Sequence, residues 1–332
     1  MNNENKKSDE ASENKIEKKE DDKNLKSNKK NKIIIGITSL LVLGLIIFGI
    51  VLIGLATYLN NGHIPRFSSN SEKKNYTVSI NDVKNLDLEI IDSDVIIEEN
   101  TDSKNMEIEY YTALERKVNI EHIGNKLSIK ENKNIVGINF NFFTEKRKFI
   151  IRIPKSSNID INSENKIGNF IIKDLDIKSL MINSKIGDVY LTNTSISDTE
   201  IKLATGNLKI DNLKSKNSSL KINVATGNVK LNNINDLKDI SVDNKIGDTD
   251  LSSSTIKDIN ITNKLGNIEV SNLPSESSDN INLKTTTGNI TLSNLSANNS
   301  ITLKTTEGDI IAELSDEESN FTNSSNKKKQ LF

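Results

Sequence analysis

The chain has 332 residues, with 44 basic and 46 acidic side chains and a formal net charge of −2. It contains no Cys and no Trp, and only 4% of its residues are aromatic. The near-neutral charge gives no overall field to attract nucleic acid, and the absence of Cys excludes disulfides and thiolate metal sites. Any core has to be built from Ile, Leu and Val, which suits β-strands.

Residues 1–32 are almost wholly polar, with ten Lys and eight acidic residues and no apolar periodicity. Such a segment cannot bury enough apolar surface to offset the entropy lost on ordering. We therefore expect a disordered tail.

Residues 33–59 contain no charged side chain. As a helix they would be about 40 Å long, more than the roughly 30 Å that a bilayer core requires. A cleaved signal peptide is the competing interpretation, but its apolar region would be only about 7 to 15 residues long. We therefore predict one uncleaved transmembrane helix.

The orientation of this helix follows from its flanking cations. Seven Lys lie between Lys18 and Lys32, against Arg66, Lys73 and Lys74 after the helix. The positive-inside rule then places the N-terminus in the cytoplasm and everything after residue 60 outside the cell membrane. Residues 60–75 are polar and are expected to be a linker.

Residues 76–160 contain short runs in which apolar and polar residues alternate, such as Leu86 to Ile91 and Phe149 to Ile153. Alternation with a period of two is typical of strands with one buried face. We expect an irregular β region that either caps the following repeats or begins them.

A Gly followed by Asn or Asp recurs through residues 161–314 with spacings of 19 to 22 residues. A fixed period of this size indicates stacked structural repeats. We interpret the glycines as structural turn residues: Gly168, Gly187, Gly206, Gly227, Gly247, Gly266, Gly288 and Gly308.

Four positions around each Gly are apolar in nearly every repeat. Relative to the Gly they are −7, −5, +2 and +4, and the exceptions are Thr199, Ser163 and Thr249. One repeat is too small to bury its own apolar face, so we predict an all-β fold, a parallel β-solenoid of about eight coils with an aliphatic interior. An antiparallel sandwich is the alternative, because it also needs frequent turns.

Gly and Asn both tolerate positive φ, and we infer that this property explains why a Gly followed by Asn or Asp forms the corner of each repeat. A ninth, degenerate copy fits upstream when Ser93 takes the place of Gly and Asp94 that of Asn. Residues 315–332 are expected to be a polar tail.

Five short phrases in this region are distinctive: Ile151-Arg152-Ile153-Pro154, Thr205-Gly206-Asn207, Thr226-Gly227-Asn228, Thr287-Gly288-Asn289 and Glu307-Gly308-Asp309. They resemble the DUF4097 family of bacterial envelope proteins, described as "putative adhesin" proteins. The resemblance covers residues 80–314, with Ser93 departing from the usual Gly. It implies a non-catalytic envelope protein, and membrane-anchored Gram-positive relatives imply a link to envelope stress.

Candidate catalytic and metal-binding residues are sparse. The only His residues are His63 and His122, with no Cys to pair with them, so a His-dependent nucleophile is not expected. Asp248-Thr249-Asp250 is the nearest approach to a calcium cluster, but we interpret it as surface. Polysaccharide cleavage would need paired carboxylates, for which the candidates are Asp174, Asp188, Asp248, Asp250 and Asp309.

We therefore expect no enzyme, cofactor or metal. The leading hypothesis is a membrane-anchored binding or scaffolding module that contacts an envelope glycan or surface protein. Outward residues such as Lys284-Thr285-Thr286 above Lys304-Thr305-Thr306 would form its flat face. The alternatives are a sensor of envelope stress and a polysaccharide-cleaving solenoid.

Overall fold

The computed structural model describes residues 72–112, 116–133, 148–155, 157–215, 217–274, 278–295, 297–314, 321–324 and 329–331. The expected tail at residues 1–32, the expected transmembrane helix at 33–59 and most of the linker lie outside these ranges. Within them, no helix has the length and apolar character needed to cross a membrane. The described residues all belong to one compact unit.

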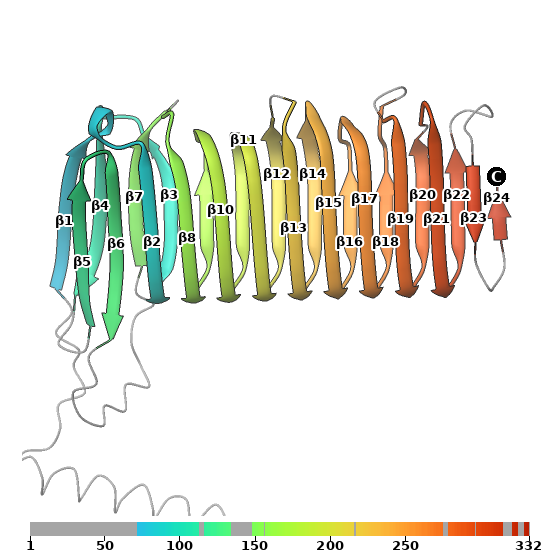
Figure 1. The fold of residues 1–332 in the computed structure, drawn as a ribbon, viewed down its shortest axis with the longest axis horizontal. Coiled ribbons are helices and arrows are strands. Elements are labelled where there is room, and N and C mark those ends of the chain that lie inside the picture. Colours follow the sequence, from blue (N-terminus) through green and yellow to red (C-terminus); the bar gives the residue numbers. More distant parts are fainter. Residues whose placement is uncertain are drawn as a thin grey trace, which may run out of the picture. The chain divides into compact units, whose positions relative to one another are not determined.

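The described chain is built almost entirely of strands (Figure 1). A single 3-10 turn, Ile80–Asp82, follows the first strand. The strands are β1 (Glu72–Ser79), β2 (Asn85–Asp92), β3 (Asp94–Asn100), β4 (Asn105–Thr112), β5 (Arg116–Ile123), β6 (Lys126–Lys133), β7 (Lys148–Pro154), β8 (Asp160–Ile167), β9 (Phe170–Lys173), β10 (Asp176–Ile186), β11 (Val189–Thr205), β12 (Leu208–Lys214), β13 (Ser219–Thr226), β14 (Val229–Asn235), β15 (Leu237–Ile246), β16 (Thr249–Ser252), β17 (Ile256–Leu265), β18 (Ile268–Ser271), β19 (Asn280–Thr287), β20 (Ile290–Leu295), β21 (Ser300–Glu307), β22 (Ile310–Leu314), β23 (Phe321–Ser324) and β24 (Lys329–Leu331).

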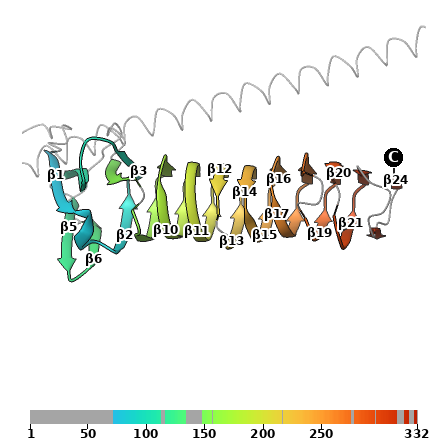
Figure 2. The same cartoon turned by 90° about the horizontal axis from the view of Figure 1, so that it is seen from above.

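The repeats stack as a parallel β-solenoid, in two rows of strands joined at the glycine corners (Figures 1 and 2). Each strand pairs in parallel with the equivalent strand one repeat later, as β13 does with β15 and β14 with β16. The long strand β11 belongs to both rows, since its first half pairs with β12 and its second half with β13. The predicted all-β solenoid is confirmed, and the antiparallel sandwich is wrong for the repeats.

The first coil consists of β2 and β3, with Ser93 at its corner. Leu86 is the register partner of Ile161, and Val95 that of Phe170. The degenerate copy predicted around Ser93 is therefore a true coil, and the solenoid begins within the region expected to be irregular.

Five further strands, β1, β4, β5, β6 and β7, extend both rows beyond this coil (Figure 1). In one row β7 pairs with β3 in parallel, β4 pairs antiparallel with β7, and β1 pairs antiparallel with β4. In the other row β6 pairs with β2 in parallel and β5 pairs antiparallel with β6. The outermost strands carry charges, such as Lys73 on β1 and Glu121 on β5, which discourage pairing with other sheet edges.

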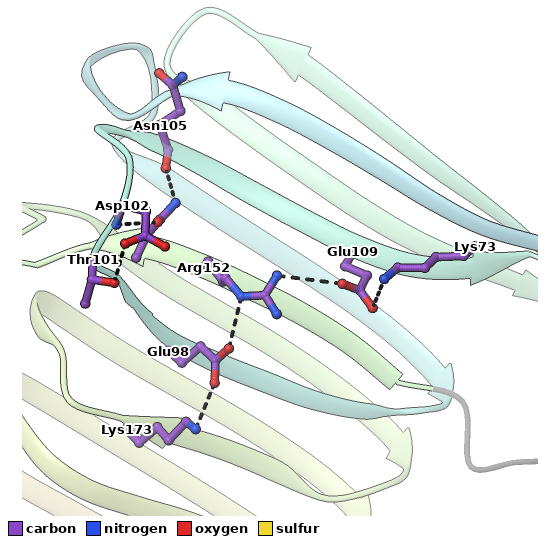
Figure 3. A network of polar contacts seen from close by, with 9 residues as sticks. Lys73, Glu98, Thr101, Asp102, Asn105, Glu109, Arg152 and Lys173 are labelled. Atoms are coloured by element: carbon purple, nitrogen blue, oxygen red, sulfur yellow. Dashed lines mark hydrogen bonds and ion pairs between the residues drawn. The ribbon is translucent and has the colours of Figure 1, made fainter.

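A chain of ion pairs joins three of these added strands, β1, β4 and β7, to strands β3 and β9 of the coils (Figure 3). The Arg152 Nε lies 3.1 Å from Glu98 Oε1, and its Nη1 lies 3.7 Å from Glu109 Oε2. Lys173 and Lys73 extend the chain at its two ends, at 2.8 Å from Glu98 and 2.9 Å from Glu109. The hydrogen bond from Lys73, aided by the charge of Arg152, holds the pKa of Glu109 below its ordinary value.

The C-terminal stretch expected to be a polar tail contains two short strands. β23 pairs in parallel with β21, and β24 pairs in parallel with β22. These pairings continue both rows of the solenoid beyond residue 314.

The interior follows the apolar pattern of the sequence. Side chains at positions −7, −5, +2 and +4 are buried in the coils from Gly168 to Gly308, and Phe170 is the largest of them. The polar exceptions also point inward, since Ser163, Thr199 and Thr249 are 0%, 6% and 1% exposed. Geometry, rather than polarity, therefore determines which side chains enter the core.

Position −3 is a fifth inward position and is often polar. The Asn263 amide donates to the carbonyls of Gly247 and Asn267, at 3.1 and 3.0 Å. The equivalent Asn165 is 2% exposed, and its amide oxygen and nitrogen make no hydrogen bond in the described structure. Two copies of one structural position therefore differ in whether their polar atoms are satisfied.

We predict that replacing these two residues by Leu has opposite effects. Asn165→Leu should raise the free energy of unfolding by about 1 kcal/mol or more, because it removes unsatisfied buried polar atoms. Asn263→Leu should lower it by about 2 kcal/mol, because it leaves the Gly247 carbonyl without this donor and the buried Thr249 hydroxyl without its acceptor. Chemical denaturation of both variants measures the difference. Equal destabilisation would contradict the assignment.

Candidate functional site at the glycine edge

The eight corner glycines form a straight column along one edge of the solenoid. Their φ angles lie between +131° and +154°. A Cβ built on any of them would lie 1.8 to 2.1 Å from the carbonyl oxygen of the corner residue one coil earlier. Only Gly fits this column, both for its φ and because a backbone carbonyl occupies the space of the missing side chain.

The residue after each Gly forms a second column, through hydrogen bonds between coils. Its side-chain Oδ1 accepts the backbone N–H of the equivalent residue one coil later, at 2.7 to 3.0 Å. The column consists of Asp94, Asn169, Asp188, Asn207, Asn228, Asp248, Asn267, Asn289 and Asp309.

This geometry corrects the reason inferred for Asn and Asp at the corner. None of these residues has positive φ. They are selected because both carry an Oδ1 acceptor, and an Asp never follows another Asp in the column. Adjacent carboxylates would repel each other, which explains why Asn separates them.

A second corner lies six residues after each Gly from Gly168 to Gly288, and the sequence analysis missed it. The residues there adopt the left-handed conformation, with φ between 51° and 59°. The signal was present in the sequence, since all seven are Asn, Asp or Ser: Asp174, Asn193, Asn212, Asn233, Ser253, Asn272 and Asn294.

The first coil is held differently at its corner. The buried Glu131 carboxylate accepts the backbone N–H groups of Ile91 and Asp92, at 2.7 and 2.9 Å. It also accepts the hydroxyl of Ser93 at 3.0 Å, a contact that Gly could not make. This explains the one departure from Gly.

The two residues before each Gly point outward and carry the exposed chemistry of this edge. Ile167 and Ile186 are register partners and are 48% and 52% exposed. Ile246 and Leu265 form a second such pair, at 48% and 50%. An exposed Lys precedes each of the four: Lys166, Lys185, Lys245 and Lys264.

Between the two apolar pairs, the corresponding residues are small. The coils of Gly206 and Gly227 carry Ala-Thr at these two positions. Over the first pair, an open surface cavity of about 260 Å³ is lined by Ile167, Ile186 and the backbone of Gly168 and Gly187, among others. This cavity forms a shallow groove beside the apolar row, over the backbone of Gly168 and Gly187.

The flat face expected near the C-terminus is present in part. Lys284 and Lys304 are exposed register partners, but Thr285 and Thr305 point inward. The hydroxyls of these two Thr donate to the carbonyls of Gly266 and Gly288, both at 2.9 Å. The expectation that all three residues of each triplet face outward is therefore wrong for the middle one.

The residues considered for catalysis or metal binding have structural partners. The Asp188 and Asp248 carboxylates accept backbone N–H groups of the next coil, Thr249 is buried, and Asp250 lies 3.4 Å from Lys230. Asp174 occupies the second corner. His122 is exposed, whereas His63 lies outside the described residues. Within those residues, no group of three or more His, Cys, Asp or Glu is placed to hold a metal ion.

The family model named Toastrack DUF4097 matches residues 83–271 and 223–329 of this sequence. The chain belongs to this family. The resemblance seen in the sequence is thereby confirmed, and the match includes the glycine column. No curated protein sequence matched the chain.

Solved bacterial structures are similar to the family member described here. A "putative adhesin" from Parabacteroides merdae is 15% identical, with a TM-score of 0.46, over 78% of this chain and 98% of that one. One from Parabacteroides distasonis is 14% identical, with a TM-score of 0.45, over 77% and 98%. One from Bacteroides fragilis is 16% identical, with a TM-score of 0.44, over 70% and 97%.

We predict that Gly247→Ala lowers the free energy of unfolding by about 3 kcal/mol or more, since its Cβ would collide with the Gly227 carbonyl at 2.0 Å. Gly124→Ala is the matched control. Gly124 has a φ of +60° but no atom within 4 Å of a built Cβ, so about 1 to 2 kcal/mol of backbone strain is expected. Thermal or urea unfolding measures both, and equal losses would contradict the stacking.

A second prediction concerns the spacing of acids in the Asn/Asp column. Asn228→Asp keeps the acceptor but places a carboxylate beside Asp248. We expect a raised carboxyl pKa and about 1 kcal/mol lower stability at pH 7. Because protonation removes the repulsion, the penalty should disappear as the pH falls below about 4.

The control for this variant is Asn282→Asp, whose register partners are Asn260 and Thr302. It should show no comparable dependence on pH. Unfolding measured between acid and neutral pH distinguishes the two, and a penalty for Asn228→Asp that is the same at every pH would contradict the account.

Proposed function

We propose that this chain is a single-pass membrane protein of the bacterial envelope, and that its solenoid is a non-catalytic, adhesin-like binding or scaffolding module. The N-terminus would lie in the cytoplasm and the solenoid outside the cell. The uncharged segment at residues 33–59, the seven Lys before it and the family assignment support this proposal.

The observation that carries the binding role is the outward face of β19 and β21. Lys284 and Lys304 are direct neighbours in the ladder and form no ion pair in the described structure. Six outward residues of the same two strands are uncharged, and the one acid of β21, Glu307, lies at the glycine corner: Asn280, Asn282, Thr286, Ser300, Thr302 and Thr306. Like charges directly opposite each other destabilise a sheet, and an anionic partner bound between the two ammonium groups would remove this cost.

A regular solenoid presents this face as a flat array, with equivalent side chains about 4.8 Å apart. Two ammonium groups among hydroxyl and amide groups fit a polymer with anionic groups and many hydroxyls. We therefore propose an envelope glycan that carries anionic groups as the partner.

The repeat also supports the absence of catalysis. Two of the corner acids that could serve a glycan-cleaving enzyme, Asp188 and Asp248, accept backbone N–H groups of the next coil. A carboxylate in that role is fixed by the fold and aligned along the edge. The face with Lys284 and Lys304 supplies no carboxylate pair of the kind glycoside cleavage requires.

Retention of the full-length protein by isolated bacterial cell walls tests the proposal. Lys284→Ala/Lys304→Ala should lower retention by about tenfold, on the basis of about 1 kcal/mol or less for each exposed charge contact. Lys238→Ala/Lys257→Ala, on adjacent coils elsewhere on the surface, removes the same charge and should retain binding.

Externally added protease on intact cells tests the orientation in the same strain. It should digest the solenoid and leave an epitope on residues 1–32 intact. Equal wall retention by both double variants, or a solenoid protected from protease, would contradict the proposal.

A further inference from the structure

The outward residues of the glycine edge form a self-complementary pattern. In the six coils from Gly168 to Gly266, position −2 is a Lys or an Ala, position −1 is apolar or Thr, and position +1 is Asn or Asp. The two Asp of this stretch, Asp188 and Asp248, lie in coils whose position −2 is Lys. The two coils with Ala at −2 have uncharged Asn207 and Asn228 at +1.

We propose that two copies of this chain associate side by side and in parallel along this edge. A two-fold axis parallel to the solenoid would bring each coil against the same coil of the second copy. If this axis passes between positions −1 and 0, the exposed apolar residue of one copy lies over the glycine of the other. The groove at Gly168 and Gly187, already lined by Ile167 and Ile186, is the place where such a side chain would fit.

The same operation places position −2 of one copy opposite position +1 of the other. Lys185 then faces the second copy's Asp188, and Lys245 faces its Asp248. Two-fold symmetry doubles each contact, so four ion pairs form. Within the described residues of one chain, neither Lys forms an ion pair, which leaves both available.

The charges also determine the direction of the two copies. An antiparallel pair would place the row of Lys against the same row of the other copy, and like charges would oppose association. The parallel pair opposes Lys to Asp or Asn. In its centre, the small side chains at Ala204 and Ala225 let the two edges approach closely.

The contact is small. Six coils span about 24 Å of edge, so the interface is narrower than a stable soluble dimer requires. Confinement to one membrane raises the effective concentration of a weak pair. The parallel direction suits such confinement, because it brings like ends of the two chains together. The argument from membrane confinement rests on the membrane anchor of the proposed function. The complementary pattern of residues along the edge does not depend on that anchor.

Single-Cys variants test the proposal, because the native sequence has no Cys. The full-length chain is reconstituted in vesicles of phosphatidylcholine and phosphatidylglycerol and treated with a short thiol crosslinker. Ile167→Cys should crosslink to itself about tenfold more than Thr192→Cys, an exposed control on the second row of strands. Adding Lys185→Glu/Lys245→Glu should abolish the crosslink, whereas Lys238→Glu/Lys257→Glu should not.

Other outcomes overturn the proposal. Crosslinking of Ile167→Cys only with Leu265→Cys would show an antiparallel pair. Crosslinking no greater than that of Thr192→Cys would show that the copies do not associate here. Ile246→Trp introduces the only Trp, and a blue shift of its emission that does not depend on protein density would show that the edge contacts lipid instead.

These measurements use no envelope ligand. Crosslinking can therefore fail while cell walls still retain the protein, and the reverse can also occur. The two proposals are tested independently.

Discussion

The stacking of glycine on glycine is the constraint on which the rest of the structure depends. Each corner carbonyl occupies the volume where the next corner would carry a Cβ, so one side chain in this column would push two coils apart. Because the coils touch at this edge, the strands on both sides pair in register, and the Asn/Asp column can bond from coil to coil. The aliphatic core then stacks like on like, and Phe170 is the one aromatic side chain at the four inward positions of the coils from Gly168 to Gly308.

This constraint separates the residues that build the fold from those that are free to bind. Inward positions and the two corners are assigned to stacking, and even their polar members serve it, as Asn263 and Thr285 do by donating to glycine carbonyls. The side chains at outward positions do not take part in the stacking of the coils, so their residue types are free to vary. Specific chemistry therefore collects in two places: the apolar and Lys rows beside the glycines, and the paired Lys284 and Lys304 on the flat face. Both surfaces arise because the strands pair in register, so that the same residue type on successive coils forms a continuous row.

Much of the fold could be predicted from the sequence, because a period of about 20 residues and four apolar positions fix strand direction and core together. The coil at Ser93 was predictable for the same reason. The role of Asn and Asp was not, because their hydrogen bonds join residues at least 19 positions apart and leave no local signature. Local reasoning attributed them to positive φ, which belongs instead to Asn193 and its equivalents. At the first corner, where Ser93 stands in place of Gly, the Glu131 carboxylate accepts the Ser93 hydroxyl from 38 positions away in the sequence. Nothing in the sequence around Glu131 indicates this contact.

Amide hydrogen exchange along the glycine edge tests the central claim most directly. If the corner were only a turn, the N–H of the residue after each Gly would be open to water and would exchange within the fastest class of loop amides. The structure instead gives each of these N–H groups, from Asn169 to Asp309, a side-chain acceptor on the preceding coil. We predict that these amides exchange as slowly as the core strand amides of β13 and β15, and fast exchange at the interior coils would contradict the account.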